Sequence, residues 1–82
     1  MQRMVTAAQI RAARALLGWS QQTLADKAIV SVNAINRLER ELVDTKTSTL
    51  AAVERALIKA GIEFVFPSGG RGEGVRFARA ER

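Results

Sequence analysis

Four side chains close together in this sequence carry groups that recognise base edges in the major groove of DNA. Asn33 and Asn36 can each pair with adenine N6 and N7, and Arg37 can pair with guanine O6 and N7. Val32 can contact the methyl group of thymine. In a helix these positions share one side, so the spacing predicts a base-reading stripe. The alternative is a surface helix whose asparagines are simply solvated.

The residues around this stripe predict two short helices joined by a tight turn. Ser20 and Ser31 are of the residue type that caps helix N-termini, and each precedes apolar residues at helical spacing. Ala25 is small enough to let the two helices approach closely. The positions expected to face inward are Leu24, Ala25, Ala28, Ile35 and Leu38.

Further helices are predicted on both sides of this pair. Thr6 and Gln9 have the spacing of a capping box, and Gly18 follows the apolar pattern as a helix stop. Thr47 or Ser48 is expected to cap a helix that runs toward residue 60. The inward positions of these two helices are Ile10, Ala13, Leu17, Leu50, Val53 and Leu57.

After Gly61 the pattern changes from helical spacing to alternation. Residues 62–66 alternate with a period of two and are rich in β-branched and aromatic types, which is typical of a strand. Residues 67–74 are rich in glycine and predict a loop, and residues 75–77 can return as a second strand. An isolated two-stranded hairpin is only marginally stable in water. Its apolar side chains therefore need a covering surface, either the chain's own helices or a strand of another subunit.

The composition narrows the classes of function. The chain has 82 residues and a formal charge of +5, a basic excess that favours a polyanionic partner but is common among soluble domains. It has no histidine, cysteine or tyrosine, and its carboxylates lack the spacing of metal ligands. We therefore expect one small, non-enzymatic domain without a metal or cofactor. The four arginines within residues 71–82 fit either a solvated tail or an auxiliary phosphate contact.

Membrane and targeting segments are not expected. No apolar run approaches the length of about 18 residues that spans a bilayer. The first residues lack the continuous apolar region of a signal peptide. We therefore expect a cytoplasmic protein without membrane contact.

A series of residues, in order and at fixed spacing, carries a family resemblance. The series is Arg14, Gly18, Trp19, Ser20, Gln21, Leu24, Ala25, Val30, Ser31, Ile35, Leu38 and Glu39. It resembles the Cro/C1-type (xenobiotic-response-element) helix-turn-helix family over about residues 6–60. The resemblance implies a mainly α, phage-repressor-like fold of four to five helices with a C-terminal β-hairpin. Residues 1–61 would form the DNA-binding domain, and residues 62–82 a hairpin and basic tail that serve dimerisation.

The resemblance also implies roles for particular residues. The helix beginning near Val32 would be the recognition helix, and Arg14 and Glu39 would form a structural ion pair. Contacts to DNA phosphates would come from Gln21, Ser31, Thr45, Lys46 and Thr47. Two positions depart from the family, because Ile29 and Glu41 stand where glycine is usual. Ile29 should be strained, since a β-branched residue is unfavourable in the left-handed conformation of that turn.

A member of this family is expected to regulate transcription as a homodimer on a near-palindromic, double-stranded DNA operator. The expected dimer contacts are Ile62, Phe64, Phe66, Val75 and Phe77. Repression by blocking polymerase is expected, and activation is also open because Asp26 or Glu41 can touch RNA polymerase. The alternative is an antitoxin or anti-activator type of interaction module, whose hairpin and tail bind a partner protein.

Overall fold

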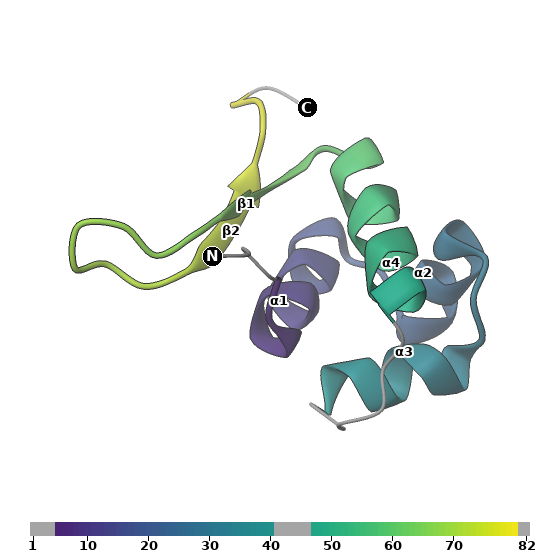
Figure 1. The fold of residues 1–82 in the computed structure, drawn as a ribbon. Helices are drawn as coiled ribbons and strands as arrows, with labels where there is room; N and C mark the ends of the chain where they lie inside the picture. Colours follow the sequence, from purple (N-terminus) through teal and green to yellow (C-terminus); the bar gives the residue numbers. More distant parts are fainter. Residues whose placement is uncertain (1–4, 41–46, 81–82) are drawn as a thin grey trace.

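The computed structural model describes residues 5–40 and 47–80. This part of the chain forms four α-helices and one hairpin: α1 (Ala7–Leu17), α2 (Gln21–Ala28), α3 (Val32–Glu39), α4 (Thr47–Lys59), β1 (Ile62–Val65) and β2 (Gly74–Phe77) (Figure 1). The expected mainly α fold with a C-terminal hairpin is confirmed. Within the described residues, no helix is both long and apolar enough to cross a membrane.

Serine and threonine side chains fix the starts of the first three helices. Thr6 and Gln9 form the predicted capping box. The hydroxyls of Ser20 and Ser31 each accept a hydrogen bond of 3.0 Å from a backbone N–H in the first turn of the following helix. The predicted start of α4 is wrong, because the helix already includes Thr47 and its N-cap position lies outside the described residues.

The turn between α2 and α3 has the strain that the sequence predicts. Ile29 lies in the left-handed region, with φ 58° and ψ 51°, and no other non-glycine residue of the described segments has positive φ. Its side chain is 90% exposed, so burial does not offset the unfavourable conformation. A backbone of this kind costs on the order of 1–3 kcal/mol.

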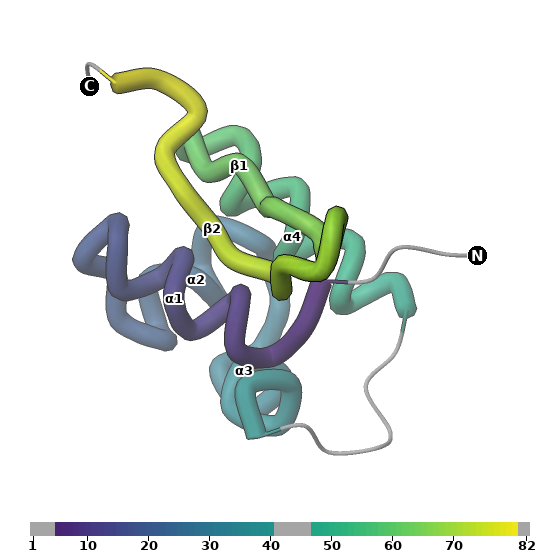
Figure 2. The backbone as a smooth tube through the Cα atoms, turned by 90° about the vertical axis from the view of Figure 1, so that its left-hand side faces the viewer, coloured from purple at the N-terminus to yellow at the C-terminus, as the bar shows by residue number. Residues whose placement is uncertain are grey.

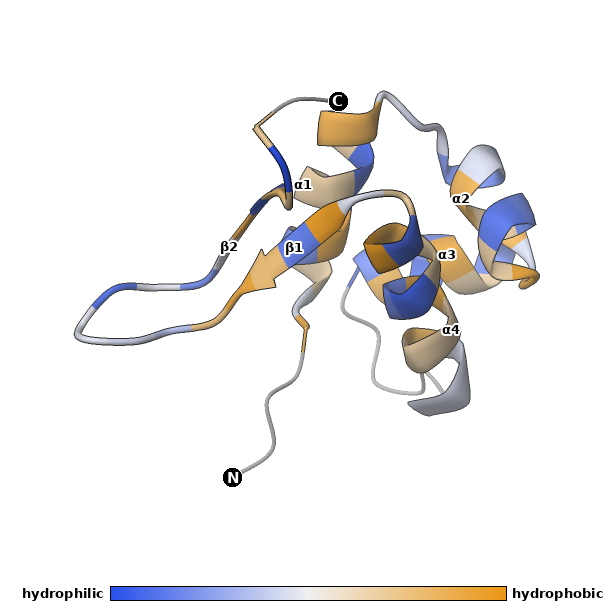
Figure 3. Ribbon diagram, turned by 90° about the horizontal axis from the view of Figure 1, so that it is seen from above, coloured by the Kyte–Doolittle hydropathy of each residue, from blue (hydrophilic) through white to orange (hydrophobic). Residues whose placement is uncertain are grey.

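All four helices and the hairpin contribute to one hydrophobic core. Ala13 and Ala25 are fully buried, which lets the helices pack closely. The helices place hydrophobic residues toward this core and hydrophilic residues toward solvent (Figure 3). Leu17 and Leu50 were expected to be fully inward but are only half-buried at its margin. The largest fully buried side chains are Ile10, Leu24, Ile35, Val53, Leu57 and Ile62.

The apolar side of the hairpin packs on the chain's own helices. The antiparallel register pairs Ile62 with Phe77 and Phe64 with Val75, so these four residues share one side of the ribbon. β2 lies against α1 and β1 against α4 (Figure 2). Ile62 and Phe64 are only 2% and 9% exposed and belong to the core. The hairpin thus shares its core with the four helices.

The chain's own helices therefore already cover most of the surface of Ile62 and Phe64, two of the residues predicted to contact a second subunit. Phe66, Val75 and Phe77 are half-buried and pack against the same core. The physical reason is that a two-stranded ribbon must cover one side, and α1 and α4 already supply that surface.

Gln9 ties α1 to both strands. Its side-chain Nε2 donates hydrogen bonds of 2.9 Å to the carbonyls of Val65 and Gly74, which face each other across the ribbon. Its Oε1 accepts from the backbone N–H of Thr6. The residue is only 3% exposed, so these polar groups have little access to water. The sequence predicts the capping role of Gln9 but not its link to the hairpin.

We predict that Gln9→Met destabilises the fold by about 1–3 kcal/mol, because buried polar groups lose their partners. Urea denaturation measures this loss, and amide hydrogen exchange should show the largest increase in β1 and β2. Gln22→Met is the matched control, since Gln22 is exposed on α2 and, among the described residues, its side chain bonds only to Asp26. Equal effects of the two substitutions would contradict the role given to Gln9.

Candidate nucleic-acid interface

The solvent side of α3 carries most of the predicted base-reading stripe. Asn33 and Arg37 are exposed, and Asn36 is half-buried beside them. Ile35 and Leu38 point the other way, into the core. Arg37 makes no side-chain hydrogen bond or ion pair within the described part of the chain.

Arg40 extends the stripe by one turn and is not among the residues predicted from the sequence. It is exposed at the C-cap of α3, and it follows Arg37 by three residues and Asn33 by seven. Its Nη1 donates a long hydrogen bond of 3.5 Å to Oδ1 of Asn36. The helical spacing was the signal that could have identified it.

Val32 is less accessible than the sequence pattern predicts. It is half-buried and packs against the core cluster at the start of α3. The reason is its place in the first turn, directly after the inter-helix turn, where an apolar side chain can still reach the core. Only part of its surface can contact a thymine methyl group.

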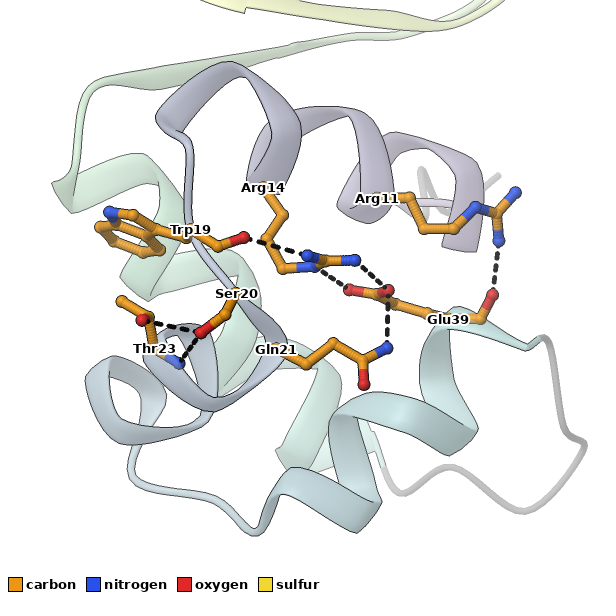
Figure 4. A network of polar contacts seen from close by, with 7 residues as sticks. All are labelled: Arg11, Arg14, Trp19, Ser20, Gln21, Thr23 and Glu39. Carbon is orange, nitrogen blue, oxygen red and sulfur yellow. Dashed lines mark hydrogen bonds and ion pairs between the residues drawn. The ribbon is translucent and has the colours of Figure 1, made fainter.

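A buried ion pair connects α3 to α1 (Figure 4). Nε and Nη2 of Arg14 donate to the two carboxylate oxygens of Glu39 at 2.7 and 2.9 Å. The Glu39 side chain is 3% exposed and that of Arg14 is 23% exposed. This bidentate geometry fixes both the distance and the relative orientation of the two helices.

Further hydrogen bonds connect this ion pair to α2 and to nearby backbone carbonyls. Gln21, the first residue of α2, donates from Nε2 to Oε1 of Glu39 at 3.1 Å. Nη1 of Arg14 donates to the carbonyl of Trp19 at 3.0 Å, and Nη1 of Arg11 donates to the carbonyl of Glu39. The Glu39 carboxylate therefore links α1 and α2 to the C-terminal end of α3.

The same contacts keep Glu39 ionised. Burial on its own raises the pKa of the Glu39 carboxyl, but hydrogen bonds from Arg14 and Gln21 and the charge of Arg14 outweigh burial and leave the pKa below its ordinary value. The hydrogen bond from Arg14 likewise raises the pKa of that guanidinium. The pair is therefore fully charged at neutral pH.

The residues assigned to phosphate contact lie at three places. Gln21 is half-buried at the start of α2, where its amide already donates to Glu39. Ser31 is exposed, and its hydroxyl oxygen accepts from the N–H of Ala34, which leaves its O–H free to donate outward. Thr47 is exposed at the start of α4. The remaining predicted positions, Thr45, Lys46 and the departure at Glu41, lie outside the described residues.

We predict that Glu39→Gln lowers the free energy of unfolding at pH 7 by about 3 kcal/mol, because Arg14 loses the carboxylate that compensates its charge. Urea denaturation measures the loss. Glu63→Gln is the matched control, since it removes the exposed ion pair with Arg76, whose side chains are 43% and 67% exposed. That control should change stability by less than about 1 kcal/mol.

The pH dependence of the free energy of unfolding distinguishes loss of the Glu39 charge from a merely steric effect of the substitution. The folded-state pKa of Glu39 lies below the value of about 4.3 of an unfolded glutamate. The contribution of ionised Glu39 to the free energy of unfolding is therefore complete above the unfolded-state pKa. It is lost as the pH falls through the folded-state pKa. Stability of the unaltered chain should decline below about pH 4 more steeply than that of Glu39→Gln. Parallel profiles would contradict the assignment.

A helix-turn-helix family model matches residues 10–61, more than half of the chain. The match runs from Ile10 in α1 through α4 and includes Arg14, Glu39 and the outward stripe of α3. No individual curated protein matches the chain significantly. Among the residues described, no cluster of three or more histidine, cysteine or acidic side chains could hold a metal ion. The matched segment and the arrangement of its helices show that the chain belongs to the Cro/C1-type helix-turn-helix family of DNA-binding regulators.

Proposed function

We propose that this regulator reads a specific operator by placing α3 in the major groove. The observation that carries the proposal is the division of α3 into two sides. One side holds the guanidinium of Arg37, which no described residue binds, and the exposed amide of Asn33. The other side is buried and is fixed to α1 and α2 through Glu39. A rigid helix with such a polar face suits direct readout of base edges.

Within this proposal each side chain has a distinct role. Arg37 binds guanine O6 and N7, and Asn33 pairs with adenine. Asn36 is the second adenine reader, although its Oδ1 already accepts a bond from Arg40. Arg40 binds a phosphate at the end of the helix or a further guanine. The accessible part of Val32 contacts a thymine methyl group.

Phosphate contacts position α3 without reading sequence. We assign them to Gln21 and Ser31 at the starts of α2 and α3, and to Thr45, Lys46 and Thr47 near the start of α4. The N–H groups at the start of α2 and the positive end of its dipole support the contact at Gln21.

One protomer supplies one recognition helix and covers one half-site. We propose a homodimer on a near-palindromic operator, with half-sites about 34–36 Å apart, which is one turn of DNA. Such a dimer represses by blocking polymerase. At other operator positions it can activate through contact with RNA polymerase, with exposed Asp26 as the candidate residue. A regulator of this kind acts where its DNA lies, so we propose a cytoplasmic location.

The dimer contact proposed here lies in the groove between α4 and the hairpin. Ile58 on α4 is 51% exposed, which is unusual for a large apolar residue. It borders a groove of about 350 Å³ between α4 and β1, whose other apolar residues include Phe64 and Phe66. A second copy of the chain covers this groove, and both copies use the same residues for the contact, as two-fold symmetry requires.

The hairpin gives no specific support to the antitoxin or anti-activator alternative. Its apolar side already packs on α1 and α4, so a partner protein would have to bind its polar side or its edges. We therefore do not propose that function.

We predict that Arg37→Ala weakens binding to the preferred operator by about 1–3 kcal/mol and relaxes preference at one base pair of each half-site. Fluorescence anisotropy with the operator and a scrambled duplex measures both effects. Arg71→Ala is the control, because it removes the same charge from the exposed hairpin loop. An equal loss on both duplexes would mean that Arg37 contacts phosphate and does not read a base.

We predict that Ile58→Glu converts the dimer to a monomer, because a charge at the centre of an apolar contact must be desolvated. Sedimentation velocity measures the change. Leu16→Glu, at another large apolar residue that is 42% exposed, should leave the dimer intact. A dimer that survives Ile58→Glu would place the contact on another surface.

A further inference from the structure

A continuous groove runs between α2 and α4. It consists of two adjoining hollows of about 380 and 300 Å³, and both are lined by Lys27, Ala56 and Lys59. Trp19 borders the first hollow, while Ile29 and Arg55 border the second. We call this feature the α2–α4 groove. None of its lining residues belongs to α3, so the groove stays accessible when α3 is occupied.

The charge in the α2–α4 groove is of one sign. Lys27, Arg55 and Lys59 line it, and no carboxylate does. Within the described segments, none of these three cations forms an ion pair. Arg55 and Lys59 are four residues apart on α4, a spacing at which like charges destabilise a helix by a few tenths of a kcal/mol. Lys27 and Lys59 lie in the last turns of α2 and α4, where a cation interacts favourably with the helix dipole. The repulsion between Arg55 and Lys59 remains, and an anionic partner would relieve it.

The groove also exposes apolar surface. Trp19 contributes an aromatic ring, and Nζ of Lys27 lies 5.8 Å from its centroid. Ile29 adds a side chain that is 90% exposed and that stands on a strained, left-handed backbone. Glycine at this position would remove the strain. A strained residue that contributes no burial to the core is typical of a binding surface.

We propose that the α2–α4 groove binds an acidic segment of a partner protein that also carries apolar side chains. Carboxylates of that segment pair with Lys27, Arg55 and Lys59, and its apolar side chains pack on Trp19 and Ile29. A DNA backbone would pair with the three cations but would make no apolar contact with the exposed Ile29. The proposal is independent of the base-reading role of α3.

The test is an NMR titration of the ¹⁵N-labelled chain with a short synthetic peptide of Glu and Leu. The backbone signals of α2 and α4 and the indole signal of Trp19 should shift, and the same peptide with Gln in place of Glu should shift them far less. The double variant Lys27→Glu with Lys59→Glu should weaken binding by roughly tenfold or more. Arg71→Glu with Arg79→Glu, which changes the net charge equally at exposed positions outside the groove, should leave binding close to its original value.

Ile29→Gly separates binding from folding. It should raise the stability of the chain, because the strain disappears, and weaken peptide binding severalfold, because the apolar contact disappears. Unchanged peptide binding in this variant would overturn the proposal. So would equal losses in the two charge-reversal variants, shifts confined to α3, or displacement of the peptide by duplex DNA. Shifts of the groove signals with protein concentration alone would assign the groove to a second copy of the chain and would equally overturn the proposal.

Discussion

The carboxylate of Glu39 orients the helix that faces the DNA. It accepts two hydrogen bonds from Arg14 on α1 and one from Gln21 on α2, while its own backbone carbonyl accepts from Arg11. A buried ion pair adds little net stability compared with apolar packing, but it permits only one geometry. Here that geometry sets the direction of α3 relative to its two neighbouring helices. The exposure of Asn33 and Arg37 follows from it, because the opposite side of α3 is held inside.

A second polar residue, Gln9, fixes the position of the hairpin, as Glu39 fixes that of α3. Gln9 belongs to the capping box of α1 and donates to carbonyls of both strands, so it ties the ribbon to α1 by hydrogen bonds. Around that attachment, Ile62 and Phe64 complete the core. The surface left for other molecules is therefore limited to polar stripes and to a few exposed apolar residues. Ile29 and Ile58 are two of these, and they lie in different grooves of the described structure.

The sequence predicts local features well because their causes are local. The caps at Thr6, Ser20 and Ser31 follow from residue types and their spacing. The strain at Ile29 follows from the family resemblance, because glycine is usual at that position. Helical periodicity likewise identifies the buried sides of the helices. The features that the sequence does not predict depend on contacts between segments far apart in the chain. The bonds from Gln9 to the strands and the burial of Phe64 join residues more than fifty positions apart. Arg40 is different, because the spacing of the stripe was sufficient to find it.

Selection of binding sites from a random pool of duplex DNA tests most directly the claim that the exposed face of α3 reads bases. We expect an enriched motif made of two symmetric half-sites about 34–36 Å apart. The same selection with Arg37→Ala should lose a conserved guanine from each half-site and keep the rest of the motif. The absence of any enriched motif, or the same motif with and without the Arg37 guanidinium, would show that this face of α3 does not read bases.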